Sequence, residues 1–315
     1  MERDKLHKIV EAARLYYQLD YSQQEIAKRL GVSRPTVSRL LQQAKADGIV
    51  QITIMDPAED NEVLALELAR MYGLKKVLVV SLPEFDDQVV KEHLGKAAAQ
   101  YLNEIVKDND TIGITWGTTL HHVAMELKPK QVKDVRVVQL KGCVSLSETN
   151  TYASEILHLF GKAYDTLPHH LPIPAIVDHP AVKQAIEADR HIRRVLDLGK
   201  QANIALFTVG SLVSESLLFR LGYFSEEERQ AIHAHAVGDI SSRFFDKDGN
   251  ICIDSVNERT IGIELNDLKR KEYSILIAGG PKKVAPIHAA LTARYANVFI
   301  TDQFTAKELL NKEDV

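Results

Sequence analysis

Residues 22–47 constrain this chain most, because they predict two short helices joined by a tight turn. Gly31 can adopt the positive φ that ends a helix, and Ser33 is a residue type that caps the start of the next one. Pro35 falls in the first turn of the second helix, where no backbone N–H is needed. A helix-turn-helix is therefore predicted, in which the start of the second helix is exposed to solvent.

The polar residues at the start of these two helices are candidate DNA contacts. The first residues of a recognition helix reach base edges in the major groove, and the free N–H groups of the preceding helix lie beside phosphate. The candidate DNA-binding residues are Gln23, Gln24, Ser33, Arg34, Pro35, Thr36, Ser38 and Arg39. A helical hairpin that only packs against its neighbours is the alternative interpretation.

Two further patterns delimit the N-terminal domain. Apolar residues at helical spacing over residues 6–16 predict a helix that braces the other two. Residues 49–56 alternate apolar and polar side chains, which predicts a short strand that would belong to a wing. We therefore predict an all-α helix-turn-helix domain, with the wing as a further element, over residues 1–56, and a second domain over residues 57–315.

Composition narrows the class of protein. Residues 1–55 hold nine Lys and Arg against six Asp and Glu, a net charge of +3; the whole chain carries −4, so the rest carries −7. The basic end is the candidate DNA-binding end. Two cysteines, Cys143 and Cys252, argue against a disulfide framework and fit a reducing cytoplasm. No apolar run is long enough to span a bilayer, so a cytoplasmic protein without a membrane partner is predicted.

Motifs for metal binding or covalent catalysis are missing from the sequence. The paired histidines have no companion cysteine or HExxH pattern, and no GxSxG motif occurs. The segment DKDGN at residues 246–250 lacks the later glutamate of a calcium loop and is interpreted as a hairpin turn. We predict neither a metal nor a cofactor.

Residues 59–74 predict a strongly amphipathic helix that ends at Gly73. It could link the two domains, pack on the second domain, or pair with a copy of itself. Its apolar positions are Val63, Leu64, Leu66, Leu68 and Ala69.

From residue 75 onward, short apolar runs alternate with helical segments. This alternation is typical of a mainly parallel sheet with helices on both faces, the doubly wound α/β fold. In that fold, ligands bind beyond the carboxyl ends of the strands. The predicted strands lie within residues 75–80, 111–117, 135–142, 203–210, 251–256, 274–280 and 297–302.

Two of these strand ends carry glycine immediately before a helix. Glycine lets the backbone approach an anion, and the helix N-terminus supplies free N–H groups and a positive potential. Ordinary glycine turns with capping threonines or solvated lysines are the alternative at both places. The candidate anion-binding residues are Gly117, Thr118, Thr119, Gly279, Gly280 and Lys283.

A third strand end places Gln139 and Lys141 just past apolar residues. Gln139 can hydrogen-bond sugar hydroxyls, and Lys141 can pair with phosphate. If its neighbours lower its pKa, Lys141 can instead form a Schiff base with an aldehyde. Asp239 and Arg243, farther along the chain, could reach the same pocket. A solvated lysine is the alternative for Lys141.

The motifs taken together resemble those of the SorC family of sugar-responsive bacterial transcription regulators, over nearly the whole chain. The segments that carry the resemblance are YSQQEIAKRLGVSRPTVSRLLQQAKADGIV, IGITWGTT, VVQLKG, ANIALFTVG, GDISSRFFD and LIAGGPKKVAPIHAAL. The family implies a homo-oligomer, dimer or tetramer, that acts on operator DNA. It also implies an effector domain related to sugar-phosphate isomerases, including glucosamine-6-phosphate deaminase and ribose-5-phosphate isomerase.

This resemblance assigns roles to the strand-end residues. It implies that the loop of Gly117, Thr118 and Thr119 holds the phosphate, with Gly279, Gly280 and Lys283 close to it. It places Gln139 and Lys141 in the sugar pocket. One departure is Cys143, which replaces the second glycine of the LKGG form and would stiffen the loop after Lys141.

The expected function is that of a repressor and not an enzyme. It would regulate deoxyribonucleoside or sugar catabolism genes and release its operator when a phosphorylated sugar, expected to be deoxyribose 5-phosphate, occupies the α/β domain. The alternative is a phosphosugar isomerase or deaminase with an accessory DNA-binding head. That alternative needs a general base near Gln139 and Lys141, and the sequence offers no unambiguous one.

Overall fold

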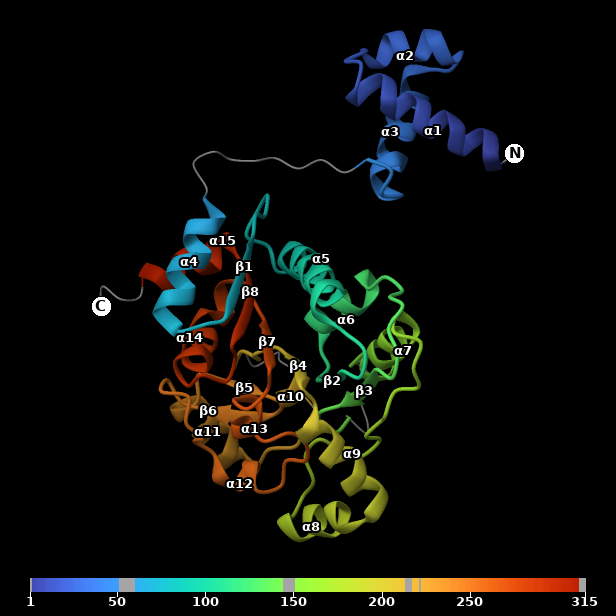
Figure 1. Cartoon of the computed structure of the whole chain (residues 1–315). Helices are drawn as coiled ribbons and strands as arrows, with labels where there is room; N and C mark the ends of the chain where they lie inside the picture. The colour runs from blue at the N-terminus through green and yellow to red at the C-terminus, as the bar shows by residue number, and fades with distance from the viewer. Residues whose placement is uncertain (1, 51–59, 144–150, 213–216, 221, 312–315) are drawn as a thin grey trace. The chain divides into compact units, whose positions relative to one another are not determined.

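The computed structural model describes residues 2–50, 60–143, 151–212, 217–220 and 222–311. Its contacts divide the chain into two compact units, Met1–Glu59 and Asp60–Val315 (Figure 1). The predicted domain boundary after residue 56 and most of the predicted wing strand at residues 49–56 lie outside the described residues.

The N-terminal unit contains three helices, α1 Glu2–Tyr17, α2 Gln23–Leu30 and α3 Arg34–Ala46. A capping box starts α2, because Ser22 Oγ accepts from the Glu25 N–H while the Glu25 carboxylate accepts from the Ser22 N–H. Gly31, with φ of 64°, ends α2. The predicted helix-turn-helix is confirmed. Its core consists of Ile9, Ala12, Ala13, Leu15, Ile26, Ala27, Val37, Leu40, Leu41 and Ala44.

The second unit is built on a sheet of six parallel strands, in the order β1-β8-β7-β4-β2-β3, as far as the described residues go. Neighbouring strands that run the same way bring all their carboxyl ends to one edge of the sheet. The strands are β1 Lys76–Val80, β2 Thr111–Ile114, β3 Arg136–Gln139, β4 Ile204–Phe207, β7 Tyr273–Ile277 and β8 Val298–Asp302.

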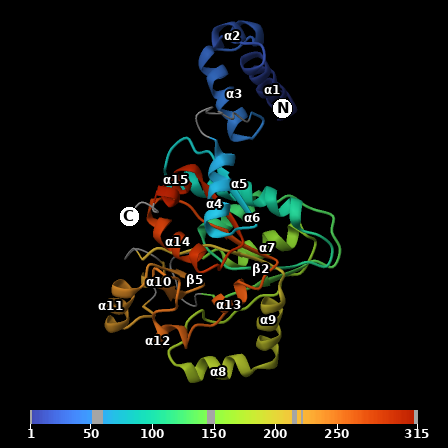
Figure 2. The same cartoon turned by 60° about the vertical axis from the view of Figure 1, so that its left-hand side comes forward.

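Helices cover both faces of this sheet, as the alternating pattern predicts (Figures 1 and 2). One core packs α5 Asp87–Ile105, α6 Thr118–Glu126 and α7 Ala153–Ala163 against one face. A second core packs α4 Asn61–Tyr72, α14 Val284–Thr292 and α15 Gln303–Leu310 against the other. The predicted doubly wound α/β architecture is therefore confirmed. The remaining helices are α8 Pro180–Ala188, α9 Arg190–Gln201, α10 Leu217–Arg220, α11 Glu226–His235, α12 Asp254–Asn257, α13 Leu265–Leu268 and the 3₁₀ turn η1 Pro281–Lys283.

One predicted strand is wrong. Within residues 251–256, Ile251 makes only an isolated antiparallel bridge with Phe245, and the chain then forms α12. Ile253 and Val256 are both buried at a spacing of three, which is helical and not strand-like. The sequence reading also missed the short hairpin of β5 Gly238–Ile240 and β6 Arg243–Phe245.

In the part of the chain that the structure describes, no helix is long and apolar enough to cross a membrane.

Candidate functional site

The carboxyl edge of the sheet opens into a cavity of about 570 Å³. It lies where the chain leaves β2, β3, β4 and β7, the position at which doubly wound folds bind ligands. Eight predicted residues line it, namely Gly117, Thr118, Thr119, Lys141, Asp239, Gly279, Gly280 and Lys283. The structure thus brings together segments that are up to 166 positions apart in the sequence, from Gly117 to Lys283.

Gly117 forms one wall of the cavity at the N-terminus of α6. Its φ of 145° belongs to the region that favours glycine, and no side chain among the described residues caps this helix. A Cβ placed on Gly117 would touch only Thr208 Cγ2, at 4.0 Å. Glycine is therefore required by the backbone conformation and not by crowding. The first N–H groups of α6 have no partner inside the helix and suit an anion.

A second glycine loop, Gly279 and Gly280, forms the opposite wall and rests on a buried carboxylate. The Gly280 N–H donates to Thr305 Oγ1 at 2.8 Å, and that hydroxyl donates to Asp302 Oδ2 at 2.7 Å. A Cβ on Gly279 would lie 2.1 Å from the same Oδ2, so only glycine fits. Sequence reasoning missed Asp302 and Thr305, because their contact with the loop depends on how β8 packs beside β7.

Lys141 is the most deeply buried cation of the cavity, with 5% of its surface exposed. Its Nζ lies 3.6 Å from the ring centroid of Trp116 and donates to Ser242 Oγ at 3.3 Å. Burial lowers the pKa of Lys141 from 10.5 to about 8, and Asp239 opposes that shift. A lysine with this pKa holds more of its amine unprotonated near neutral pH than an exposed lysine does.

Asp239 and Lys283 are further charged residues of the cavity, whose lining also includes Asp86, Asp87, Lys91 and Lys282. Burial raises the pKa of the Asp239 carboxyl, while Lys141 lowers it. Burial also lowers the pKa of Lys283 to about 8. With both lysines protonated and Asp239 ionised, the cluster carries one net positive charge, which favours a bound anion.

Two predicted pocket residues do not line this cavity. Gln139 is buried, and its Nε2 donates to the Lys141 carbonyl at 2.7 Å while its Oε1 accepts from the Leu171 N–H at 3.1 Å. Nε2 also donates to Cys143 Sγ at 3.1 Å. These bonds hold the chain beyond β3 in place. The amide of Gln139 is thus bonded to the chain around it, and its contact with a sugar stays a prediction.

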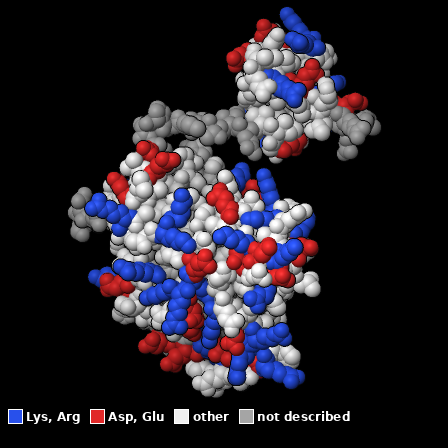
Figure 3. All heavy atoms as spheres, in the orientation of Figure 1, with Lys and Arg blue, Asp and Glu red and all other residues white. Residues whose placement is uncertain are grey.

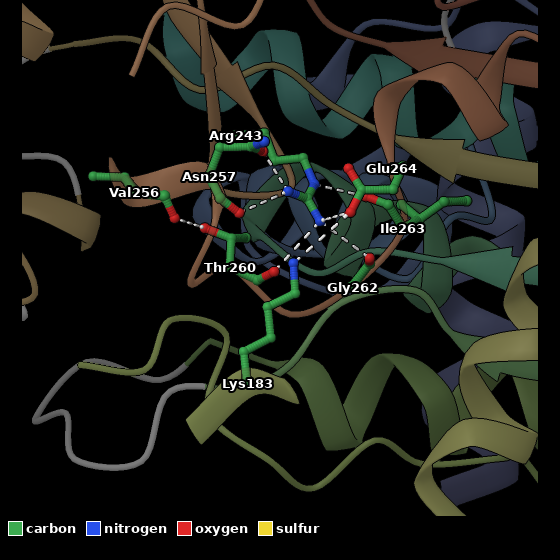
Figure 4. Close-up of polar contacts among 8 residues, drawn as sticks. All are labelled: Lys183, Arg243, Val256, Asn257, Thr260, Gly262, Ile263 and Glu264. Atoms are coloured by element: carbon green, nitrogen blue, oxygen red, sulfur yellow. Dashed lines mark hydrogen bonds and ion pairs between the residues drawn. The ribbon is translucent and has the colours of Figure 1, made fainter. Parts of the chain in front are cut away.

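Arg243 is fully buried and bonded within the protein (Figure 4). Its guanidinium donates to the Ile263 carbonyl at 3.0 Å, to Asn257 and to Glu264 Oε1 at 2.7 Å. Two further carbonyl oxygens, of Thr260 and Gly262, complete the set. Arg243 therefore organises the segment after α12 and is turned away from the cavity in which it was predicted.

The predicted DNA-binding residues lie at the starts of α2 and α3. Ser33 Oγ accepts from the Thr36 N–H and so caps α3, and the hydroxyls of Ser33 and Thr36 share a hydrogen bond of 2.8 Å. Arg34 and Arg39 are exposed. Acidic as well as basic side chains occur on the visible face of this unit (Figure 3). Direct contact with DNA stays a prediction for all eight residues.

Comparisons with known proteins agree with both units. Residues 5–59 match the Crp-like helix-turn-helix domain, and residues 56–311 match the family described as "Putative sugar-binding domain". A helix-turn-helix joined to a sugar-binding α/β domain defines a DNA-binding transcription regulator with a small-molecule site. The chain belongs to the SorC family of such regulators.

Individual relatives support this assignment. The chain is 55% identical to the deoxyribonucleoside regulator of Bacillus subtilis (strain 168) over 311 residues, 99% of each protein. It is 31% identical to the sorbitol operon regulator of Klebsiella pneumoniae, over 98% of each protein. The crystal structure of full-length SorC from that organism matches with a TM-score of 0.77 and 30% identity, covering 97% of this chain and 98% of the other.

Proposed function

We propose that this protein is a cytoplasmic repressor of deoxyribonucleoside or sugar catabolism genes, and that deoxyribose 5-phosphate releases it from its operator. The cavity carries the proposal: two glycine loops, the N-terminus of α6, the buried Lys141 and the half-buried Lys283 meet in one volume of about 570 Å³. The 55% identity to a deoxyribonucleoside regulator directs the choice among sugar phosphates.

The phosphate would bind between the two glycine loops. The N–H groups at the start of α6 and the ammonium of Lys283 both favour a dianion there. The sugar would then extend towards Lys141 and Trp116. A cavity of this size is within the range that encloses small ligands.

The proposal includes a covalent step at Lys141. With a pKa of about 8, roughly a tenth of its amine is unprotonated at pH 7. The free Nζ would add to the aldehyde carbon of the open-chain sugar, and water would leave to form an imine. Reduction with cyanoborohydride should then trap a secondary amine on Lys141, detected by mass spectrometry. An unchanged mass at saturating ligand would remove the covalent step and leave reversible binding.

Release from DNA requires that the ligand favour one arrangement of the protein over another, because a ligand shifts an equilibrium only by its differential affinity. We propose that the protein binds as a dimer or tetramer, whose two-fold symmetry would match an inverted repeat.

The first test is a thermal melt of the full chain against a panel of pentose, hexose and triose phosphates, since a ligand that binds only the folded state raises the melting temperature. We expect deoxyribose 5-phosphate to give the largest shift and to reduce binding to an operator fragment. A larger shift with another sugar phosphate would overturn the effector. Conversion of any of these sugars during the incubation would favour the isomerase or deaminase alternative.

A further inference from the structure

The hairpin β5–β6 turns beside Lys141 through two serines. Ile240 pairs with Arg243, so Ser241 and Ser242 are the two residues of the loop. Their φ angles are 55° and 66°, which makes the loop a type I′ turn. Such turns are dominated by glycine, asparagine and aspartate, because other side chains are strained in this conformation. Two adjacent serines are an unusual choice here.

Ser242 has a structural reason to occupy the turn. It is fully buried, its N–H donates to Asp239 Oδ2 at 2.9 Å, and its hydroxyl accepts from Lys141 Nζ at 3.3 Å. It therefore fixes both charged groups of the cavity floor. Ser241 differs, because its hydroxyl forms no such bond.

Ser241 lines the cavity with 5% of its surface exposed. Its Oγ is buried and has no hydrogen-bond partner in the described part of the chain. An unpaired buried hydroxyl is unfavourable, and here it is combined with a strained backbone. A bound sugar hydroxyl would supply the missing partner.

We infer that Ser241 is a specificity-determining residue, whose Oγ exchanges a hydrogen bond with a sugar hydroxyl close to the carbon that faces Lys141. This inference rests on the proposed function. The adjacent Ser242 contacts Lys141 Nζ, so we place Ser241 near the aldehyde end of the ligand. In deoxyribose 5-phosphate the first hydroxyl at that end is on C3. A site that pairs with a hydroxyl discriminates strongly against an analogue that lacks it.

The test measures dissociation constants by calorimetry for deoxyribose 5-phosphate and for its analogue without the C3 hydroxyl. We expect the wild-type protein to bind the analogue at least tenfold more weakly. Ser241→Ala should weaken binding of deoxyribose 5-phosphate by a similar factor and bind both sugars about equally. Ser241→Gly should give the same binding result while relieving the backbone strain, so it serves if the alanine variant folds poorly.

Thr301→Val is the matched control. Thr301 Oγ1 is also buried without a hydrogen-bond partner in the described residues, but Thr301 does not line the cavity. Loss of the Thr301 hydroxyl should leave both dissociation constants unchanged. If the wild-type protein binds neither sugar phosphate, the proposed function fails and the inference fails with it. If the wild type binds and Ser241→Ala retains both its affinity and its discrimination, the inference alone is overturned.

Discussion

At the scale of single residues, the cavity places two lysines, Lys141 and Lys283, near one buried carboxylate, that of Asp239. Burial lowers the pKa of both Lys141 and Lys283. Nearby carboxylates oppose only part of that shift: Asp239 acts on Lys141, and Asp87 and then Asp239 act on Lys283. A lysine with a depressed pKa binds fewer protons in the folded state than in the unfolded state between pH 8 and its ordinary 10.5. Burial of the charged lysine therefore lowers the free energy of unfolding by its full amount below pH 8. This destabilisation is relieved as the pH rises from 8 to 10.5.

The same depressed pKa predicts how adduct formation depends on pH. Well below its pKa the fraction of free amine on Lys141 rises about tenfold per pH unit, and the rise slows as the pH approaches 8. We expect the initial rate of cyanoborohydride-trapped adduct, measured by mass spectrometry, to increase from pH 6 to 8 and then to level off. Lys271 also has a pKa lowered to about 8 but does not line the cavity, so Lys271 should not be labelled. A rate that continues to rise towards pH 10 would show that Lys141 titrates like an exposed lysine.

Arg34 allows a residue-scale prediction for DNA. It is exposed at the first position of α3, from which an arginine can reach guanine in the major groove. We expect Arg34→Ala to weaken operator binding by about 1–3 kcal/mol, measured by fluorescence anisotropy. The melting-temperature shift caused by the sugar phosphate should not change.

Arg14→Ala is the control for Arg34→Ala. It removes the same charge from an exposed position on α1 and should have a smaller effect on DNA binding. Equal losses in the two variants would mean that only the general charge of the unit matters.

At the scale of elements, the phosphate-side loop depends on the start of α15. Asp302 caps that helix by accepting from the Thr305 N–H at 2.8 Å, and Thr305 in turn holds the Gly280 N–H. Strand β8 and helix α15 therefore fix the shape of the loop that follows β7. Such support by a neighbouring element keeps binding groups in place.

Thr305→Val tests this support. The change preserves the shape of the side chain but leaves the Gly280 N–H and one oxygen of Asp302 unpaired and buried. We expect the free energy of unfolding in urea to fall by about 1–3 kcal/mol and sugar-phosphate affinity to fall with it. Thr301→Val, which breaks no hydrogen bond among the described residues, should be close to neutral in both measurements. Unchanged affinity in Thr305→Val would show that the loop holds its shape alone.

The sequence could predict the roles of some residues at the strand ends and not of others. The glycines at residues 117, 279 and 280 were identified because a glycine between strand and helix is a local signal. The full set of partners of Gln139 and Arg243 could not be predicted from neighbouring residues, since Gln139 also bonds Leu171, 32 positions away, and the partners of Arg243 lie 14 to 21 positions away. Ser241 carries no sequence signal for a turn that usually needs glycine or asparagine.

At the scale of the whole molecule, α4 exposes apolar surface that the rest of its own unit does not cover. Leu68 is buried, whereas Val63 is 45% and Leu66 is 71% exposed. These two exposed residues lie three positions apart, on one face of the helix. A second copy of the chain, one of the alternatives raised by the sequence pattern, could cover them.

Leu66→Glu tests that arrangement. We expect it to lower the oligomeric state measured by sedimentation, because a charge would be placed in an apolar contact. Operator affinity should fall in parallel, since two linked DNA-binding units bind more tightly than one. Leu167→Glu, at a position 89% exposed outside α4, is the control. An unchanged oligomer in Leu66→Glu would assign self-association to another surface.

Trp116 is the single tryptophan of the chain, and the Lys141 ammonium lies against its ring. Its indole Nε1 also donates to the Gly142 carbonyl at 2.7 Å, which keeps the ring fixed on the cavity wall. Any event that neutralises or displaces that ammonium changes the electrostatic field on the indole. The protein therefore carries its own optical probe: its tryptophan fluorescence should report occupancy of the cavity without a label, in the full chain and in the presence of DNA.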